Sequence, residues 1–411
     1  MSPIMDDMTL FLLLSALAWA ADDVDALARA AVDANPGLAA MEARTAALAA
    51  AAEVADVWPD PVASVELSNL PLGGFTLSDH PMAGVQLRVQ QPLPAPGERA
   101  RRSEVAELSV EYAALQQSAA ALDLRHRVID TWWRLALTRM LAGITEVELA
   151  RLDELAETVQ ARYRVDAVGQ HAVLRVTLLR DRLSDELGDF ARADQQLTAA
   201  LSAALSAPRA FETPDAVEPL PLTGTVEGWL AAAEAQHPAL EALRVEARQA
   251  RARAELARVQ ARPSMSLWAG YRARTWPDDG GVDLVSGGVA VPVPVGSRAR
   301  SQGLQAAAEQ DARAAEDRLA AALDTLRAEL TTLHAAWDRA FAKAGTYRDT
   351  LLPAAQAVRE ATLADFQVGR ADFAAVYQAE VELLALERAE RIAAVETHLR
   401  AAELEALIAT R

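Results

Sequence analysis

The sequence predicts a mainly α-helical protein with a small β part, built from long helical hairpins. Alanine, the strongest helix former, dominates the apolar residues, whereas glycine and proline number only 19 each. Residues 98–164 form one long segment without proline. Two pairs of short segments alternate between apolar and polar residues with a period of two, which is typical of strands. Because alanine is small, we expect the helices to approach one another closely.

Composition excludes several classes of protein. The 411 residues include no cysteine and carry a formal net charge of -18. Without cysteine there is no disulfide scaffold, no cysteine metal site and no thiol nucleophile. An acidic chain repels the phosphates of nucleic acids, so no nucleic-acid partner is expected. If the chain surrounds a channel, the same excess of negative charge is expected to favour cations.

The amino terminus is typical of a secretory signal. Residues 9–17 form a short apolar run, and the small-Trp-small sequence at 18–20 fits a signal-peptidase site. Asp6 and Asp7 stand where positive charge is usual, so a buried amino-terminal helix is the alternative. We assign 1–20 as the signal peptide. No other stretch approaches the roughly 18 apolar residues of a transmembrane helix, so a membrane location would require strands.

Landmarks in the first half of the chain return in the same order in the second half. Their spacing is nearly constant, which indicates a tandem duplication. The matched pairs are Pro36 and Pro238, Pro61 and Pro263, Gly97 and Gly296, and Tyr163 and Phe366. We expect a first repeat over 21–208 and a second over 225–411. The proline-rich segment 209–224 between them is the predicted inter-repeat linker.

Each half is expected to contain a helix, a strand pair, a long helix, a turn and a further helix. The long helix of the first half would span about 100 Å at 1.5 Å per residue. Such narrow hairpins must bury their apolar stripes against copies of themselves. Pro353 is expected to kink or break the second long helix. The expected ranges are 24–57, 62–91, 98–164 and 171–207, and then 225–261, 298–365 and 371–410.

The alternating segments indicate whether the predicted sheet lies in water or in a membrane. In the first half, Val85, Leu87 and Val89 alternate with polar residues; in the second, Trp268 interrupts an otherwise polar face. A soluble sheet with one buried face alternates in the same way. Four strands offer too little partner surface for that arrangement, whereas lipid covers an apolar face and closure by oligomerisation removes the edges. Trp58 and Trp276 at strand ends suit a membrane interface.

Several motifs carry a family resemblance. They are WPDP before the first strand, PGERAR and VGSRAR at the starts of the long helices, and YRVDAVGQHAVLR and FQVGRADFAAVYQAE at the turns. On these motifs the chain resembles the TolC-like outer-membrane efflux channels over nearly its whole length. The resemblance implies a homotrimer in which four strands per protomer form a 12-stranded transmembrane β-barrel, joined to an α-barrel in the periplasm. Its implied partners are a periplasmic adaptor protein, an inner-membrane efflux transporter and outer-membrane lipid.

The resemblance and the alternation together give candidate site residues. The resemblance implies adaptor docking at the turns, although Asp166 stands where the family has glycine; Asp tolerates left-handed backbone. Family members carry an acidic periplasmic gate, but Ala375 and Gln378 occupy those positions here, and Asp372, Glu380 and Glu382 are the nearby candidates. The docking residues are Val165, Asp166, Ala167, Val168, Val368, Gly369, Arg370, Ala371 and Asp372. The alternation predicts a barrel lumen lined by Glu66, Gln86, Arg88, Gln90 and Arg272.

The sequence carries no motif for catalysis, so no enzyme activity, cofactor or metal site is expected. There is no glycine-rich phosphate loop, no GxSxG and no HExxH. The expected function is passive conduction of drugs or metal cations delivered by the transporter. The heavy-metal branch of the family is a possible assignment, although the scarcity of methionine and the lack of cysteine leave no soft-metal relay. The alternatives are a periplasmic adaptor and a soluble helical scaffold.

Overall fold

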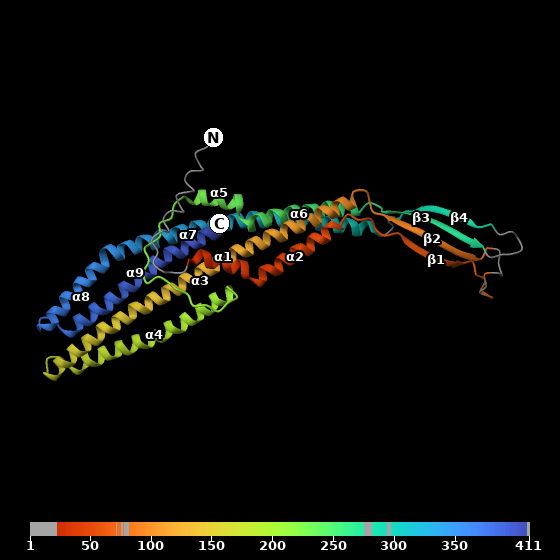
Figure 1. Cartoon of the computed structure of the whole chain (residues 1–411). Helices are drawn as coiled ribbons and strands as arrows, with labels where there is room; N and C mark the ends of the chain where they lie inside the picture. Colours follow the sequence, from red (N-terminus) through yellow and green to blue (C-terminus); the bar gives the residue numbers. More distant parts are fainter. Residues whose placement is uncertain are drawn as a thin grey trace. The chain divides into compact units, whose positions relative to one another are not determined.

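The structure, a computed structural model, describes residues 23–70, 72–74, 77, 82–274, 282–293 and 297–408. The predicted signal peptide, Trp276 and Gly296 lie outside these residues. The fold is mainly α-helical with one four-stranded antiparallel sheet, as predicted (Figure 1). Within the described residues, no helix is both long enough and apolar enough to cross a membrane.

The same order of elements occurs in both halves of the chain. The first half contains α1 (Val24–Ala34), α2 (Pro36–Glu53), β1 (Val62–Ser68), β2 (Gly84–Leu93), α3 (Glu98–Arg164) and α4 (Gln170–Ala204). The second contains α5 (Val226–Gln236), α6 (Pro238–Gln260), β3 (Met265–Arg274), β4 (Leu284–Ala290), α7 (Ser297–Thr346), the π-helix η2 (Tyr347–Leu351), α8 (Leu352–Gln367) and α9 (Phe373–Ile408). The predicted bounds of α3 agree with the structure.

The predictions of single helices over 24–57 and 225–261 were wrong. Each helix is broken before a proline, at Asn35–Pro36 and at His237–Pro238. Proline forces the preceding residue away from helical geometry, and Asn35 and His237 accordingly adopt extended backbone with ψ of 116° and 119°. Asn35 then caps α2, because its Oδ1 accepts a hydrogen bond from the Gly37 amide at 2.9 Å.

Pro353 disturbs its helix as expected, but the chain does not leave helical geometry. The residues immediately before α8 form the π-helix η2, and Pro353 occupies the first turn of α8. Proline lacks a backbone N–H, and a local π-turn accommodates the lost hydrogen bond. The second long helix therefore consists of α7, η2 and α8 in succession.

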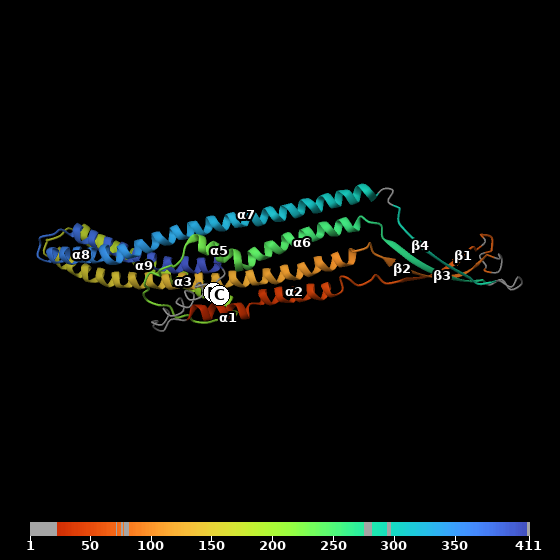
Figure 2. The ribbon, with the colours of Figure 1, turned by 90° about the horizontal axis from the view of Figure 1, so that it is seen from above.

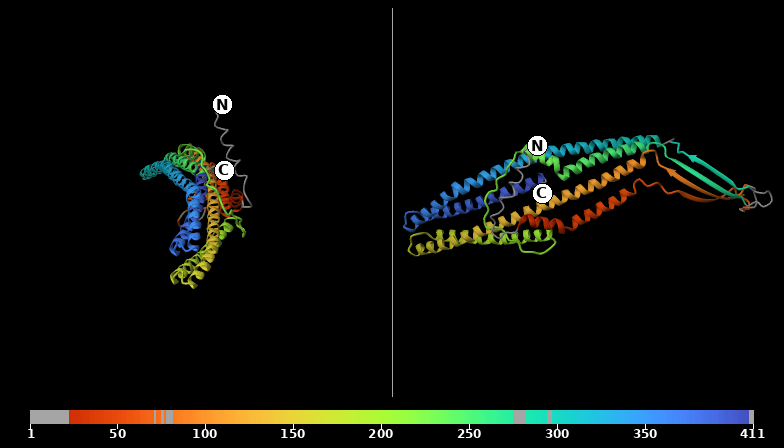
Figure 3. Two further views of the ribbon diagram at one scale, coloured as in Figure 1. Left: turned by 90° about the vertical axis from the view of Figure 1, so that its left-hand side faces the viewer. Right: turned by 45° about the horizontal axis from the view of Figure 1, so that its top comes forward.

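The described chain divides into two compact units that each combine both halves of the sequence. The first unit holds residues up to 39, 118–237 and those from 324 onward. Within it, the hairpins α3–α4 and α8–α9 run side by side (Figure 3). Their shared core is apolar and includes Leu152, Val159, Val176, Phe366 and Val376. A second core in this unit includes Leu27, Val128, Trp132, Leu135 and Leu201.

The second unit holds residues 40–117 and 238–323. Its helical segments, from α2, α3, α6 and α7, lie side by side in that order (Figure 2). Four buried alanines form an apolar cluster between α6 and α7: Ala247, Ala250, Ala312 and Ala315. These small side chains pack between the two helices, as the abundance of alanine led us to expect.

The sheet belongs to the second unit and has strand order β1-β2-β3-β4. Its register pairs even-numbered residues with even-numbered residues across all three strand pairs, for example Glu66 with Gln86 and Gln86 with Arg272. Directly opposed residues share a face, so all even-numbered strand residues form one face and all odd-numbered residues the other. We call these the even face and the odd face.

The two faces differ completely in charge. Every charged residue of the four strands lies on the even face: Glu66, Arg88, Arg272 and Arg274. The odd face is apolar except for Gln91 and the Tyr271 hydroxyl, and its large side chains are exposed to solvent. They include Val65, Leu67, Leu87, Val89, Met265, Leu267, Val285 and Val289. The odd face therefore needs an apolar covering that the protomer does not supply.

Trp268, the residue that interrupts the polar alternation, has a structural explanation. Its ring lies under the guanidinium group of Arg88, at 4.5 Å from the ring centroid. A Cβ atom on Gly288, the register partner of Trp268, would come within about 3 Å of that ring. Glycine on the neighbouring strand therefore gives the indole room to lie against the even face.

We predict that a charge is tolerated on the even face and not on the odd face. Leu87→Arg places a guanidinium group in lipid if the odd face is covered by a bilayer, at a cost of about 2–4 kcal/mol near the midplane. The control is Ser286→Arg, one row away on the even face. The yield of folded, detergent-extracted oligomer from membranes should fall sharply for Leu87→Arg alone. Equal yields for the two variants would contradict the assignment of the faces.

Candidate functional site

The predicted docking residues lie at the two hairpin turns of the first unit. In the α3–α4 turn Asp166 adopts left-handed backbone with φ of 58°, and in the α8–α9 turn Gly369 does so with φ of 78°. Aspartate at 166 thus tolerates the left-handed geometry of this turn, as expected. Arg162 links the turns, because its guanidinium group donates to the Phe366 carbonyl and lies 4.6 Å from the centroid of the Phe366 ring.

The turns contain apolar side chains of two kinds. Val168 and Ala371 pack against the core beneath the turns. Val165 and Val368 point away from it and are 72% and 67% exposed. The docking set predicted from sequence therefore includes residues that support the turns as well as residues available to a partner.

The three carboxylates proposed for a gate occupy different environments. Asp372 is exposed and caps α9, because its Oδ1 accepts a hydrogen bond from the Ala375 amide at 2.9 Å. Glu380 is buried, and its Oε1 accepts from Nε of Arg359 at 2.9 Å. Glu382 is exposed on α9. The structure does not bring the three together, and their gating role stays a prediction.

A partly buried polar network joins the two hairpins, and sequence reasoning missed most of it. Arg151 of α3 forms a bidentate ion pair with Glu387 of α9, at 3.1 and 3.2 Å, and also reaches Glu148 at 3.2 Å. Arg388 of α9 pairs with Glu186 of α4 through two contacts of 2.9 Å. The network thus connects α3, α4 and α9 at one level of the first unit.

The burial of the Glu148 carboxyl is the least favourable feature of this network. Its side chain is fully buried, and Oε1 has no hydrogen-bond partner. Burial, with a smaller contribution from the negative charge of Glu380, raises the pKa of Glu148 to about 7, although Arg151 acts in the opposite direction. The carboxyl is therefore close to half protonated at neutral pH. No periodicity signal distinguishes it from the many exposed glutamates of the same helix.

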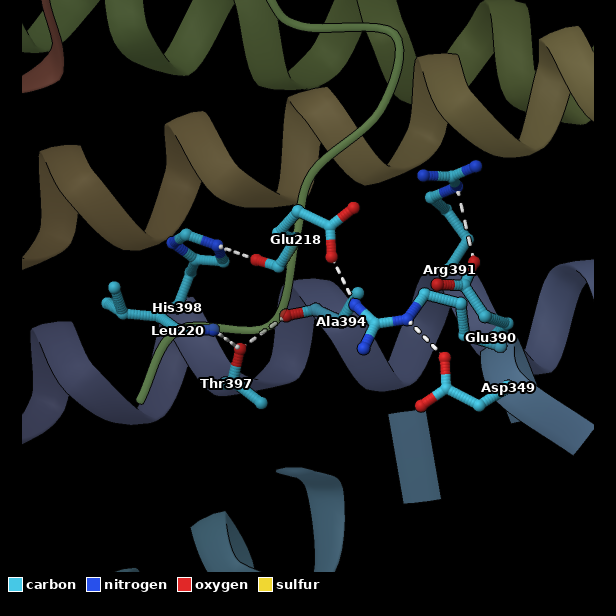
Figure 4. Close-up of polar contacts among 9 residues, drawn as sticks. Glu218, Leu220, Asp349, Glu390, Arg391, Ala394, Thr397 and His398 are labelled. Carbon is cyan, nitrogen blue, oxygen red and sulfur yellow. Dashed lines mark hydrogen bonds and ion pairs between the residues drawn. The ribbon is translucent and has the colours of Figure 1, made fainter. Parts of the chain in front are cut away.

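The inter-repeat linker, predicted over 209–224, forms hydrogen bonds and an ion pair with several helices of the first unit (Figure 4). The Leu220 amide donates to Oγ1 of buried Thr397 at 2.8 Å, and Nε1 of Trp337 donates to the Leu220 carbonyl at 3.0 Å. The Glu218 carboxylate pairs with Arg348 of η2. Nε2 of His398 donates to the Glu218 carbonyl at 2.8 Å. The linker thus connects α7, η2 and α9.

His398, which donates a hydrogen bond to the linker, is held in a buried environment that favours its neutral form. Its ring stacks on Trp133 with a centroid separation of 4.1 Å, and burial lowers its pKa. Trp133 thus serves packing between α3 and α9. Within the described residues, no group of three or more histidine, aspartate or glutamate side chains could hold a metal ion.

All five residues predicted to line a lumen lie on the even face of the sheet. Nη2 of Arg272 donates to Oε1 of Gln86 at 2.8 Å, and Nε2 of Gln90 donates to Oγ of Ser266 at 3.0 Å. Arg88 stacks on Trp268, and Glu66 is exposed. The face therefore presents polar and charged side chains that are held by their neighbours.

Comparison with known proteins supports an efflux role. Residues 229–410 match the family described as Outer membrane efflux protein. The match covers most of the second half of the chain. No curated protein sequence matches the chain.

Solved structures share the fold over nearly the whole chain. The outer membrane protein VceC from Vibrio cholerae is 18% identical with a TM-score of 0.78, over 94% of this chain and 95% of that chain. The MtrE outer membrane channel of Neisseria gonorrhoeae, in its open state, is 16% identical with a TM-score of 0.72, over 94% and 88%. CusC, described in connection with transmembrane channel formation, is 17% identical with a TM-score of 0.75, over 97% and 95%.

These findings confirm the predicted resemblance to outer-membrane efflux channels. The fold class is confirmed as mainly helical with a small antiparallel sheet.

We predict that Glu148 makes stability fall as pH rises. Its pKa in the folded chain is raised above the unfolded value, so its contribution is complete below about pH 4.5 and is lost as pH passes through about 7. The difference amounts to at most roughly 3 kcal/mol, at about 1.4 kcal/mol per pH unit. Melting temperatures of the unchanged protein and Glu148→Gln, measured from pH 4.5 to 8.5, should diverge in favour of the variant at high pH. Parallel curves would show that Glu148 does not titrate in this range.

We predict that the linker is held mainly by its buried hydroxyl contact and little by its exposed ion pair. Thr397→Val leaves the Leu220 amide without its partner and should cost about 1–3 kcal/mol. Glu218→Gln removes an exposed pair with Arg348 and should cost about 0–1 kcal/mol. Denaturant unfolding in detergent compares the two. A larger loss for Glu218→Gln would reverse the order of importance.

Proposed function

We propose that this chain is an outer-membrane efflux channel and acts as a homotrimer in which each protomer supplies four strands to a 12-stranded transmembrane β-barrel. The observation that carries the proposal is the sheet itself, which is apolar and exposed on its odd face and open at the edge strands β1 and β4. Lipid covers such a face, and closure with two further copies pairs both edges. The even face then lines an aqueous lumen.

The helices support lateral assembly. Several large apolar side chains on α3, α4, α8 and α9 are exposed in the protomer, among them Val147, Leu174, Leu178, Val358 and Ile392. In a long hairpin, such residues are buried when neighbouring copies pack side by side. We propose that they form contacts of an α-barrel. The two halves, 21–208 and 225–411 with the linker 209–224, act as repeats within it.

The proposed activity is passive conduction from the periplasm to the exterior. The sequence contains no nucleotide-binding motif, so an inner-membrane transporter would supply the energy, and a periplasmic adaptor would join it to this channel. The exposed valines of the two turns, Val165 and Val368, suit insertion of an apolar partner tip. Asp372 and Glu382, which are exposed near the α8–α9 turn, are the proposed charged groups at the entrance, with Glu380 behind them.

The assembly can be tested directly with purified protein. Electron microscopy in detergent should show a threefold ring with a hollow rod, and single channels should conduct in planar bilayers. A monomer that does not conduct would favour a soluble helical scaffold. A protein that sediments with inner-membrane transporter complexes but forms no pore would favour the periplasmic adaptor.

We predict that the exposed valines of the turns are needed for export. Val165→Asp with Val368→Asp should leave oligomer formation intact, because neither side chain packs in the core, while export from cells and cross-linking to the adaptor fall several-fold. The control Gln367→Asp adds a charge beside Val368 without removing an apolar group.

Ala167→Trp, at an exposed turn position, tests the same surface by adding bulk. It should reduce cross-linking to the adaptor without reducing oligomer yield. Normal export in all these variants would show that the adaptor docks elsewhere.

A further inference from the structure

The charge of the sheet is opposite in sign to the charge of the whole chain. The chain carries 58 acidic and 40 basic residues, which led to the expectation of cation preference. On the even face of the sheet, three arginines stand against one carboxylate, Glu66. The average charge of the chain therefore does not describe the part of the channel that the strands would enclose.

The charges of Arg88 and Arg272 are not neutralised within the described residues. Arg88 is held over the Trp268 ring and has no carboxylate partner there, and its Nε is buried without a hydrogen-bond acceptor. Arg272 donates to a neutral group, Oε1 of Gln86. Neither contact removes the positive charge, because an indole ring and an amide are both uncharged.

The nearby acidic groups leave this positive charge in place. Glu66 lies in the same row as Arg272, with Gln86 between them in the register, so it offsets part of the charge. Asp283, beyond the end of β3, accepts hydrogen bonds from the Arg274 amide and from the hydroxyl of Tyr271, which belongs to the odd face. Arg88 lies on the strand next to Glu66 and one row away, so Glu66 offsets part of its charge too, whereas Asp283 lies closer to Arg272 than to Arg88.

From this arrangement we infer that Arg88 and Arg272 make the strand section of the pore attractive to anions, so that they select anionic solutes at the outer end of the channel. The inference rests on the proposed trimer with the even face toward the lumen. Three copies would place the arginines around one shared opening, where charge of one sign concentrates counter-ions. Stacking on Trp268 holds the Arg88 guanidinium group against the wall, and the hydrogen bond that Arg272 donates to Gln86 does the same for Arg272, which leaves the opening free.

The test is the ratio of chloride to potassium permeability of single channels, from reversal potentials across a KCl gradient. Salt near 0.1 M or below keeps the screening length at about 10 Å or more. Arg88→Gln with Arg272→Gln should lower the ratio by about twofold or more, whereas Arg88→Lys with Arg272→Lys should keep it. Glu66→Gln, on the same face, should raise it.

A further variant guards against loss of folding in the arginine substitutions. Ser286→Asp adds a carboxylate to the row that holds Arg88 and removes no contact of an arginine, and it should also lower the ratio. Conducting channels whose ratio is the same in the glutamine, lysine and aspartate variants would overturn the inference while leaving the trimeric pore intact. Absence of conductance in the unchanged protein would overturn the proposed function and the inference together.

Discussion

The rest of the structure depends on one unsatisfied surface, the exposed apolar face of a sheet that is open at both edges. Four strands bury nothing on the odd face within the protomer, and β1 and β4 each leave one row of backbone groups unpaired. In water this combination favours aggregation; in a bilayer it favours closure. The alternation of apolar and polar residues thus favours lipid over water on the odd face. The open edges favour closure with further copies of the chain. Because a shift of register by one residue would exchange the faces, the three register pairings are held to one solution.

The first unit, which holds the hairpins α3–α4 and α8–α9, meets a different constraint, because long hairpins have little interior. Core residues such as Val159 and Phe366 form an apolar seam between the hairpins. Arg151 and Arg388 of the partly buried network pair across the hairpins with Glu387 and Glu186. Ion pairs removed from water contribute little net stability but penalise any arrangement that separates them. The network therefore defines how the hairpins of one protomer align more than it strengthens their association. The linker adds fixed contacts to α7, η2 and α9 in the same unit.

The sequence predicts the features that depend on local pattern and misses those that depend on tertiary contact. Period-two alternation placed Gln86, Arg88 and Arg272 on one face, and the PGERAR motif and the YRVDAVGQHAVLR turn segment gave the bounds of α3. Pro36 and Pro238 were recognised as landmarks of a duplication, yet their effect on the preceding residue, which breaks both helices, was overlooked. Glu148 looks like any exposed glutamate because local pattern does not reveal its burial, and the carboxylates that act on it, Glu380 and Glu387, lie over 200 residues later in the chain. Trp268 looked anomalous because its partners, Arg88 and Gly288, lie on the neighbouring strands.

The same distinction applies to charge. Net charge is a property of the whole chain, whereas an ion in a channel responds to the groups within about one screening length. Most acidic residues lie on the helices, but basic residues there balance most of them in number and many of the two kinds pair, as Glu246 does with Arg318 and Glu309 with Arg258. Much of the acidic excess lies in the segments between the helices and strands. The strands carry few charges, and those they carry lie on one face with arginine in excess. A protein can therefore be strongly acidic overall and still present a basic wall where the strands enclose the path, because the alternation that keeps charge out of lipid also concentrates every strand charge on the opposite face.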